Sequence, residues 1–375
     1  MLFLGKTKFI FLMQNSATQI KKLIMPNNIP ALTSIRGLAA LAVVFYHINL
    51  TFGGGLFFFS LFKHGDLGVD LFFVLSGFIM AYVYHKENMS KKYFLFFYRK
   101  FIISRIARIY PLHLITLLFT LGLVIILPDF YNRYPDYFTE ASFIYNIFLI
   151  QNWGFIKVSW NMVSWSISAE WFMYLLFPFM LLIKSYIIKS YQIALLAVTT
   201  ITLHYSIIFY YEWAGYGGMS LGGMIRVFFE FSLGFLVFFI KHLFKKTFIS
   251  FKGNLNIIFS SLAVYSFYEQ DLWFIFLPSV TLMIIHFSLI NCTLSNILSK
   301  RLFIYFGNIS FSLYMWHWLI IQIQNWLIAY NFIQVNDGIS IYTSCITMIL
   351  LSILVAHLSF LYIETPARRL GRKLI

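Results

Sequence analysis

Long apolar segments alternate along this chain with short polar loops. A membrane core about 30 Å thick is crossed by roughly 20 apolar residues in an α-helix. Segments of suitable length lie at residues 33–51, 67–85, 107–127, 165–183, 192–211, 223–241, 254–268, 272–290, 307–330 and 340–363. The pattern predicts an all-α fold, a polytopic membrane helix bundle with about ten transmembrane helices. Residues 141–153 are also apolar, but this stretch is too brief to cross.

Charged residues divide the loops into two sets that alternate along the chain. One set is basic, with clusters around Lys92, Lys246 and Arg372. The other set is mainly acidic and includes Asp136 and Asp337. Basic loops of membrane proteins face the cytoplasm, so we expect both termini to be cytoplasmic.

The composition fits a membrane protein and excludes other classes. Of the 375 residues, 60% are hydrophobic and only 11% are charged, whereas charged residues make up about a quarter of soluble domains. The net charge of +15 lies in short clusters between apolar segments, so it indicates membrane topology, and we expect no nucleic-acid partner. Cys292 and Cys345 offer neither a disulfide framework nor metal-ligand spacing. We expect a cytoplasmic segment (1–30), a transmembrane domain (31–366) and a basic cytoplasmic tail (367–375).

The segment from Ser34 to His47 places two ionisable groups, Arg36 and His47, in an apolar run. They are eleven residues apart, almost three helical turns, so they share a face and lie about 16 Å apart along the axis. If Arg36 sits at one membrane face, His47 lies well inside the membrane, where an ionisable group indicates function. For this segment alone, a structural interpretation has equal weight: Arg36 would extend to the membrane interface, and His47 would bond to a neighbouring helix.

Two other predicted spans carry acids near their outer ends. Asp70 lies near the start of the second span, where it could orient a histidine or bind a sugar hydroxyl, and Gly77 after it suits close helix packing. In the fourth span, Ser166, Glu170 and Tyr174 recur every four residues and therefore form a polar stripe on one face. A buried carboxylate such as Glu170 must be paired, protonated or functional, and a general base is one such function.

Two further groups of residues stand out. Arg105 and Arg108 are three residues apart on one helix face at the cytoplasmic side, which suits bidentate capture of phosphate. A simple positive-inside anchor is the alternative. In the ninth span, Ser310, Tyr314 and His317 share a face, so a second intramembrane histidine lies on a polar stripe.

Taken together, these residues resemble the acyltransferase-3 family, membrane O-acyltransferases of bacterial surface polysaccharides and related glycans. Six blocks in the family's order carry the resemblance: Arg36 with His47, Gly-Val-Asp-Leu-Phe-Phe-Val-Leu-Ser-Gly-Phe at 68–78, Arg-x-x-Arg at 105–108, Trp-Ser-Ile-Ser-Ala-Glu at 165–170, Ile-Ser-Phe-Ser-Leu-Tyr-Met-Trp-His at 309–317, and Glu364-Thr365-Pro366. The family often has an acid pair or Glu-Gln where Ala169, Glu170 and Trp171 stand, so only Glu170 carries over. We expect no fused hydrolase-like domain, because the sequence ends soon after Glu364.

The resemblance implies a donor and a mechanism. Acetyl-CoA, used as a substrate and not as a permanently bound cofactor, would anchor its phosphates at Arg105 and Arg108 from the cytoplasm, with Arg36 near the entrance. Its thioester would reach toward His47, which would be the general base or would carry the acyl group transiently. Glu170 would orient or activate His47 or the acceptor hydroxyl.

The resemblance also assigns residues to the remaining parts of the site. Tyr314 and His317 would line the tunnel or stabilise the oxyanion, and Asp70 and Ser166 would help to bind substrate. The acceptor would be a hydroxyl of a surface polysaccharide, a lipopolysaccharide or a lipid-linked glycan at a bacterial cytoplasmic (inner) membrane. The depths expected for His47 and Glu170 nearly coincide, so we expect direct or water-mediated hydrogen bonding between them.

Two other function classes fit parts of the pattern. A glycan or small-molecule transporter or flippase would also place Arg, Glu and His inside helices, and a non-catalytic membrane scaffold would pair these groups internally. The placement of Arg36 and His47 on one face favours a donor tunnel, and hence the enzyme. The acyl group, the sugar and its hydroxyl, and the oligomeric state, with a homo-oligomer as one option, are open.

Overall fold

A computed structural model describes residues 29–54, 56–87, 90–127, 135–155, 160–186, 189–213, 221–250, 255–269, 273–335 and 337–375. Every regular element in these ranges is a helix, which confirms the predicted all-α class. The elements are α2 (Pro30–Thr51), α3 (Phe57–Ser60), α4 (Leu67–Tyr84), α5 (Lys91–Ile126), η1 (Pro135–Tyr137), α7 (Glu140–Ile147), η2 (Met162–Ser164), α8 (Trp165–Tyr186), α9 (Ser190–Trp213), α10 (Leu221–Ile240), η3 (Lys241–Phe244), α11 (Lys245–Ser250), α12 (Leu255–Ser266), α13 (Trp273–Leu289), α14 (Thr293–Leu298), α15 (Arg301–Ala329), α16 (Gly338–Ser359), η5 (Phe360–Glu364) and α17 (Thr365–Lys373). Nearly all of the predicted N-terminal segment lies outside the described residues.

The number of candidate spans differs from the expected ten. Seven segments of the described chain are long and apolar enough to cross a membrane: Pro30–Thr51, Leu67–Tyr84, Tyr93–Ile126, Met162–Lys184, Ser190–Tyr210, Leu221–Ser250 and Gly338–Lys373. The other predicted spans became α12, α13 and α15. α12 and α13 have only 12 and 17 residues, shorter than the roughly 20 that cross a bilayer. α15 has 29 residues, but its polar side chains lower its mean hydropathy.

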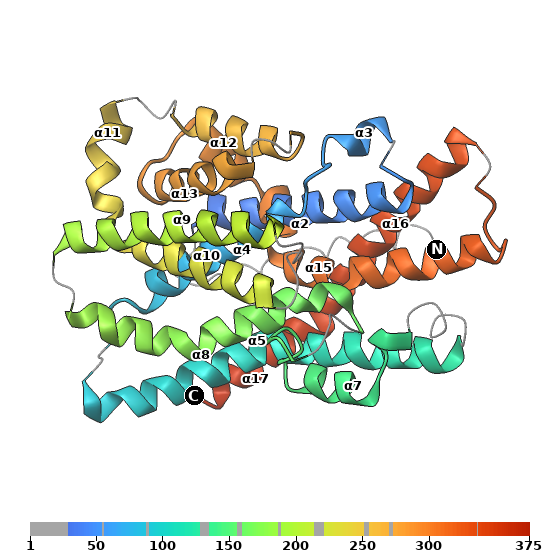
Figure 1. Cartoon of the computed structure of the whole chain (residues 1–375), viewed down its shortest axis with the longest axis horizontal. Helices are drawn as coiled ribbons and strands as arrows, with labels where there is room; N and C mark the ends of the chain where they lie inside the picture. Colours follow the sequence, from blue (N-terminus) through green and yellow to red (C-terminus); the bar gives the residue numbers. More distant parts are fainter. Residues whose placement is uncertain are drawn as a thin grey trace, which may run out of the picture.

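Most of the long helices run side by side, with α11 at one end of the molecule (Figure 1). α2 packs on α15, and α10 packs between α4 and α9. α7 covers part of the apolar stretch 141–153, and its eight residues span only about 12 Å, so this helix does not cross. The two helix pairs α2–α15 and α4–α10 carry the candidate site described below.

Glycines bring these helix pairs into close contact. A Cβ atom on Gly307 of α15 would collide with the Thr33 carbonyl of α2. Gly77 of α4 and Gly234 of α10 likewise face the backbone of the opposite helix. Small residues allow this backbone approach in membrane bundles, so the packing role predicted for Gly77 is confirmed.

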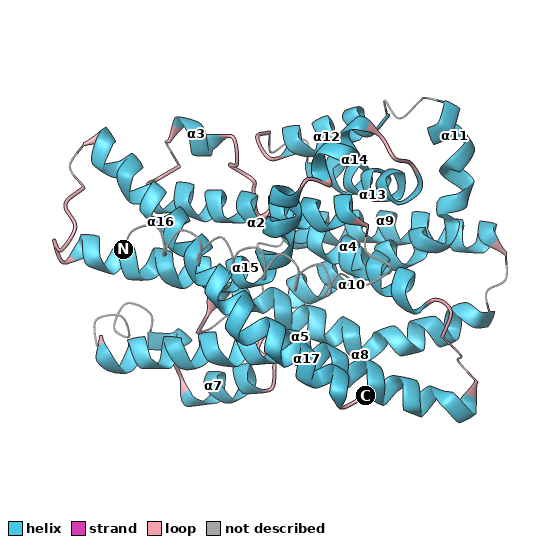
Figure 2. Cartoon of the chain, turned by 180° about the vertical axis from the view of Figure 1, so that it is seen from behind, coloured by secondary structure: helices cyan, strands magenta, loops and turns pink. Residues whose placement is uncertain are grey.

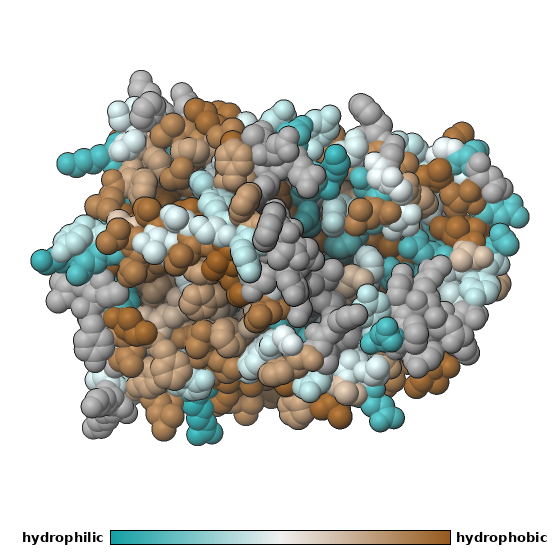
Figure 3. All heavy atoms as spheres, viewed as in Figure 1, coloured by the Kyte–Doolittle hydropathy of each residue, from teal (hydrophilic) through white to brown (hydrophobic). Residues whose placement is uncertain are grey.

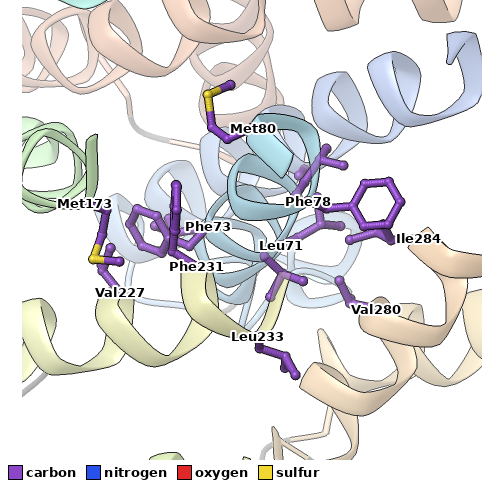
Figure 4. Close-up of a cluster of buried hydrophobic side chains, with 14 of the residues drawn as sticks. Leu71, Phe73, Phe78, Met80, Met173, Val227, Phe231, Leu233, Val280 and Ile284 are labelled. Atoms are coloured by element: carbon purple, nitrogen blue, oxygen red, sulfur yellow. The ribbon is translucent and has the colours of Figure 1, made fainter. Parts of the chain in front are cut away.

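Apolar side chains fill the interior and also cover much of the outside. Figure 4 shows Phe73, Phe231 and Met173 close together where α4, α8 and α10 meet, and Phe78 on the other side of α4, beside Ile284 of α13. On the outside, Leu195 of α9 and Leu350 of α16 are 65% and 61% exposed. Figure 3 shows apolar side chains over α9 and α12. Large exposed apolar surfaces mark contact with a membrane or a partner. In a multi-pass membrane protein such a surface contacts the lipid.

Candidate active site

Two histidines meet at the contact between α2 and α15. Nε2 of His317 lies 3.1 Å from Nδ1 of His47, and the ring centroids are 5.0 Å apart. His317 is fully buried and His47 is partly buried. The indole of Trp318 meets the His47 ring edge to face at 5.2 Å. The two predicted intramembrane histidines therefore form one unit.

The hydrogen bonds of this pair define where its protons lie. Nδ1 of His47 is 2.9 Å from the Val43 carbonyl, and Nδ1 of His317 is 2.7 Å from the Tyr314 carbonyl. Carbonyl oxygens only accept, so both Nδ1 atoms carry the proton in the neutral rings. Nε2 of His317 then accepts from His47, whose Nδ1 proton is shared with Val43. Nε2 of His47 keeps its lone pair and has no hydrogen-bond partner among the described residues.

Tyr314 and Ser166 join α15 to the start of α8 next to the histidines. The Tyr314 hydroxyl donates to the Val163 carbonyl at 2.9 Å, and Ser166 Oγ lies 2.8 Å from the same hydroxyl. Both side chains are buried. In this arrangement Tyr314 and His317 each donate their proton to a backbone carbonyl, so neither is directed toward an oxyanion.

Glu170 lies on the side of α8 that faces α4. Its Oε1 accepts hydrogen bonds from Ser76 of α4 and from Tyr174, both at 2.6 Å. Within the described part of the chain no direct hydrogen bond joins Glu170 to His47, so the direct form of the expected contact is not formed. The reason is orientation, because equal depth in a bundle does not make two helix faces point at each other.

Of the predicted donor arginines, Arg36 lies in the first part of α2, and Arg105 and Arg108 lie in the middle of α5. Arg36 Nη2 donates to the Gly307 carbonyl at 3.0 Å, while its buried Nε has no partner among the described residues. Arg105 is buried, donates to the Tyr84 hydroxyl at 3.4 Å, and lies 5.7 Å from the ring centroid of Tyr174. Arg108 makes no hydrogen bond or ion pair within the described ranges.

Asp70 is occupied by a partner that the sequence did not indicate. Its two carboxylate oxygens accept from Nε and Nη2 of Arg226 in α10, a bidentate ion pair. Glu230, one turn further along α10, lies 3.4 Å from Arg226 Nε and 3.7 Å from His204 Nε2. Just outside the span, burial raises the pKa of Asp66 against the opposing effect of Arg226. These charged groups cross-link α4, α9 and α10.

The match to known proteins covers most of the chain. A sequence model of the family described as "Acyltransferase domain" matches residues 29–357. The chain belongs to the acyltransferase-3 family. The predicted family is confirmed.

Two relatives of this acyltransferase-3 protein illustrate the match. O-acetyltransferase OatA of Staphylococcus aureus is 28% identical over 390 residues, covering 95% of this chain and 60% of OatA. The putative O-acetyltransferase SACOL0978 of the same species is 27% identical over 373 residues, covering 92% of this chain and 58% of the relative. The chain thus spans about three fifths of the length of these relatives. No solved structure matches it.

The predicted site residues fall into three groups in this structure. The first holds His47, His317, Tyr314 and Ser166; the second holds Arg36, Arg105 and Arg108; and Asp70 stands apart in the ion pair with Arg226. Glu170 connects to the second group, because its partner Tyr174 lies against Arg105. Within the described residues, no set of three or more His, Cys, Asp or Glu side chains could hold a metal ion.

Sequence reasoning overlooked one residue of the arginine group. Arg368, assigned to a basic tail, lies in the helix α17 and within electrostatic range of Arg36, Arg105 and Arg108. Glu364, one turn earlier, accepts from both Arg368 and Ser312 of α15. The available signal was the block Glu364-Thr365-Pro366, which places an acid at the end of an apolar helix beside basic residues.

Proposed function

We propose that this protein transfers an acetyl group from cytoplasmic acetyl-CoA to a hydroxyl of a surface polysaccharide, lipopolysaccharide or lipid-linked glycan. The family supports acyl transfer, and the relatives named O-acetyltransferases support acetyl as the group transferred. The candidate membrane helices and the bacterial relatives support the cytoplasmic membrane of a bacterium as the location.

The observation that carries this proposal is the free lone pair on Nε2 of His47. With Nδ1 protonated and hydrogen-bonded to His317, Nε2 can accept the proton of an acceptor hydroxyl. The hydroxyl oxygen then attacks the thioester carbonyl, and the proton passes to the departing thiolate of CoA. His317 supports the positive charge that develops on His47, as the third group of a catalytic triad does.

A second route uses the same nitrogen. Nε2 of His47 could attack the thioester and carry the acetyl group before passing it to the acceptor. Incubation with radiolabelled acetyl-CoA in the absence of acceptor separates the routes, because only the second one leaves label on the protein. Loss of that label in the His47→Ala variant would place it on the histidine.

The donor is assigned to the arginine end of the bundle. Within the described residues, the buried Nε of Arg36 has no hydrogen-bond partner, and Arg108 makes no hydrogen bond or ion pair. Arginine forks match phosphate oxygens bidentately. Arg36 and His47 lie in the same helix, about 16 Å apart along its axis. This separation suits a donor whose phosphates and thioester are joined by a long arm.

The direct test is mass spectrometry of surface glycans from cells with and without the gene. We expect an acetyl mass increment that depends on the gene and is absent when His47 is replaced by Ala, while membrane expression of the variant stays near normal. Arg99→Gln, a change at an exposed position of α5, serves as a matched control and should keep the increment. Wild-type acetylation by the His47→Ala variant would contradict the role of this histidine.

A further inference from the structure

The C-terminal helix α17 lies along α5 (Figure 2), the helix that carries Arg105 and Arg108. Gly371 is buried, and a Cβ atom there would collide with the side chain of Ala107, which lies between Arg105 and Arg108. Arg368 precedes Gly371 by three residues and therefore shares its helix face. The helix thus presents Arg368 to the segment that carries Arg105 and Arg108.

Glu364 holds Arg368 in place. One oxygen of this buried carboxylate accepts from Nη2 of Arg368, and the other accepts from the hydroxyl of Ser312 in α15. Glu364 ends the π-helical turn η5, a feature that is frequent at functional sites. The side chain of Arg368 is 27% exposed, although its Nε atom is buried, so this arginine lies at the edge of the bundle and not in its centre.

The charge in this region is unbalanced. Among the described residues, Arg36 and Arg368 interact electrostatically with each other, with Arg108 and Arg105, and with the acids Glu364 and Glu170. The Nε atoms of Arg36 and Arg368 are buried and have no hydrogen-bond partner in the described part of the chain. Unpaired buried donors are unfavourable, so this cluster, which has excess positive charge and spare N–H groups, fits an anion with several oxygen atoms.

We propose that Arg368, held by Glu364 and carried on α17, is a phosphate-binding residue of the donor site, together with Arg36, Arg105 and Arg108. This inference rests on the proposed function and adds a residue and an element to it. A guanidinium has five N–H donors, so Arg368 can keep Glu364 on one edge while its Nε edge binds a phosphate oxygen of the donor. The C-terminal helix then forms one wall of the donor site.

The test compares Arg368→Gln with Lys373→Gln, which removes one positive charge from an exposed position of the same helix. Binding of acetyl-CoA to the purified full-length protein is measured by calorimetry. We expect Arg368→Gln to weaken binding about tenfold or more, with a smaller dependence on salt, and Lys373→Gln to leave the affinity unchanged. Turnover at saturating acetyl-CoA should stay close to wild type, because Arg368 does not touch the reacting atoms.

A phosphate-free donor provides the second measurement. S-acetylpantetheine carries the same thioester without the nucleotide phosphates, so its turnover should be equal in wild type and Arg368→Gln. If Arg368→Gln does not fold, the double variant Glu364→Gln/Arg368→Gln removes both charges of the buried pair together and should bind acetyl-CoA as weakly. Wild-type affinity for acetyl-CoA in either folded variant would overturn the assignment while leaving acyl transfer intact. A wild-type protein that neither binds acetyl-CoA nor transfers acetyl would overturn the proposed function, and the assignment with it.

Discussion

The proposed role of the histidine pair depends on a free lone pair on one atom, Nε2 of His47. In the proposed mechanism His317 acts through His47: its Nε2, 3.1 Å from Nδ1 of His47, accepts that proton and so keeps the lone pair on the opposite nitrogen. Replacing His317 by Phe removes this acceptor, and we expect kcat to fall about a hundredfold or more, the usual contribution of a positioned base. The KM for acetyl-CoA should change little, since the donor arginines are untouched.

His317→Gln is the matched variant for that prediction. A glutamine oxygen can still accept from His47, so this change should retain more activity than Phe at equal expression. A purely structural histidine would give a different result. The total activity of both variants would then fall only as far as the protein yield, and kcat per folded molecule would be unchanged.

At the same scale, the ion pair between Asp70 and Arg226 makes a prediction about stability. Removing Arg226 leaves the buried Asp70 carboxylate unpaired, which costs roughly 3–5 kcal/mol, whereas removing Asp70 leaves Arg226 in contact with Glu230 and should cost less. We therefore expect Asp70→Asn and Arg226→Gln each to lower the thermal unfolding temperature clearly. Asp70→Leu with Arg226→Met removes both charges of the bidentate pair and should recover part of the loss, because Glu230 then lacks its contact with Arg226.

Activity of this double variant then decides the role of Asp70. If Asp70 only cross-links α4 and α10, the stable double variant acetylates glycan normally. If it also binds the acceptor sugar, as the family resemblance suggested, the double variant is folded but has a raised KM for the acceptor. Equal stability of the two single variants and the wild type would contradict the ion pair itself.

At the scale of helices, the contact between α2 and α15 places His47 against His317. Gly307 allows this approach, and its carbonyl also accepts from Arg36. Gly307→Ala forces the helices apart and should cost about 1–3 kcal/mol in stability, together with most of the activity. Gly122→Ala is the control, because a Cβ atom at Gly122 of α5 meets open space. A Gly307→Ala protein as stable and active as the control would show that the close contact is dispensable.

At the scale of the whole molecule, the distribution of charged residues predicts on which side of the membrane each loop and both termini lie. Both termini lie on the same side only if the chain crosses the membrane an even number of times. The seven candidate spans and α15 would give eight crossings. The helices α12 and α13 pack against each other, and whether both cross or neither does, the number of crossings stays even. Figure 1 shows α11 at one end and the connection between α15 and α16 at the other; the charges predict that these two ends lie on opposite sides of the membrane.

Single-cysteine labelling in a background without Cys292 and Cys345 measures this directly. We expect residues near Lys92, Lys246 and the C-terminus to react only after the membrane is permeabilised. Residues near Asp136 and Asp337 should react in intact cells. Labelling of the C-terminus from outside would imply an odd number of crossings and would exchange the sides assigned to donor and acceptor.

The sequence by itself determined the class of the molecule and the composition of its polar groups. Mean hydropathy and the distribution of basic loops are local properties, so the all-α membrane class could be predicted before any contact was known. The order of the motif blocks was enough for the family. Helical periodicity also placed Arg36 and His47 on one face, because the spacing of residues within a helix is constant.

Only the tertiary structure decided which of these groups meet. His47 and His317 are 270 residues apart, and Asp70 and Arg226 are 156 apart, so their pairing depends on how each helix is rotated about its axis and which neighbour it packs against. The same holds for Glu170, which turns toward Ser76 and not toward His47. Arg368 joins the arginine group because Gly371 lets α17 lie against α5, a contact between distant surfaces that no local pattern encodes.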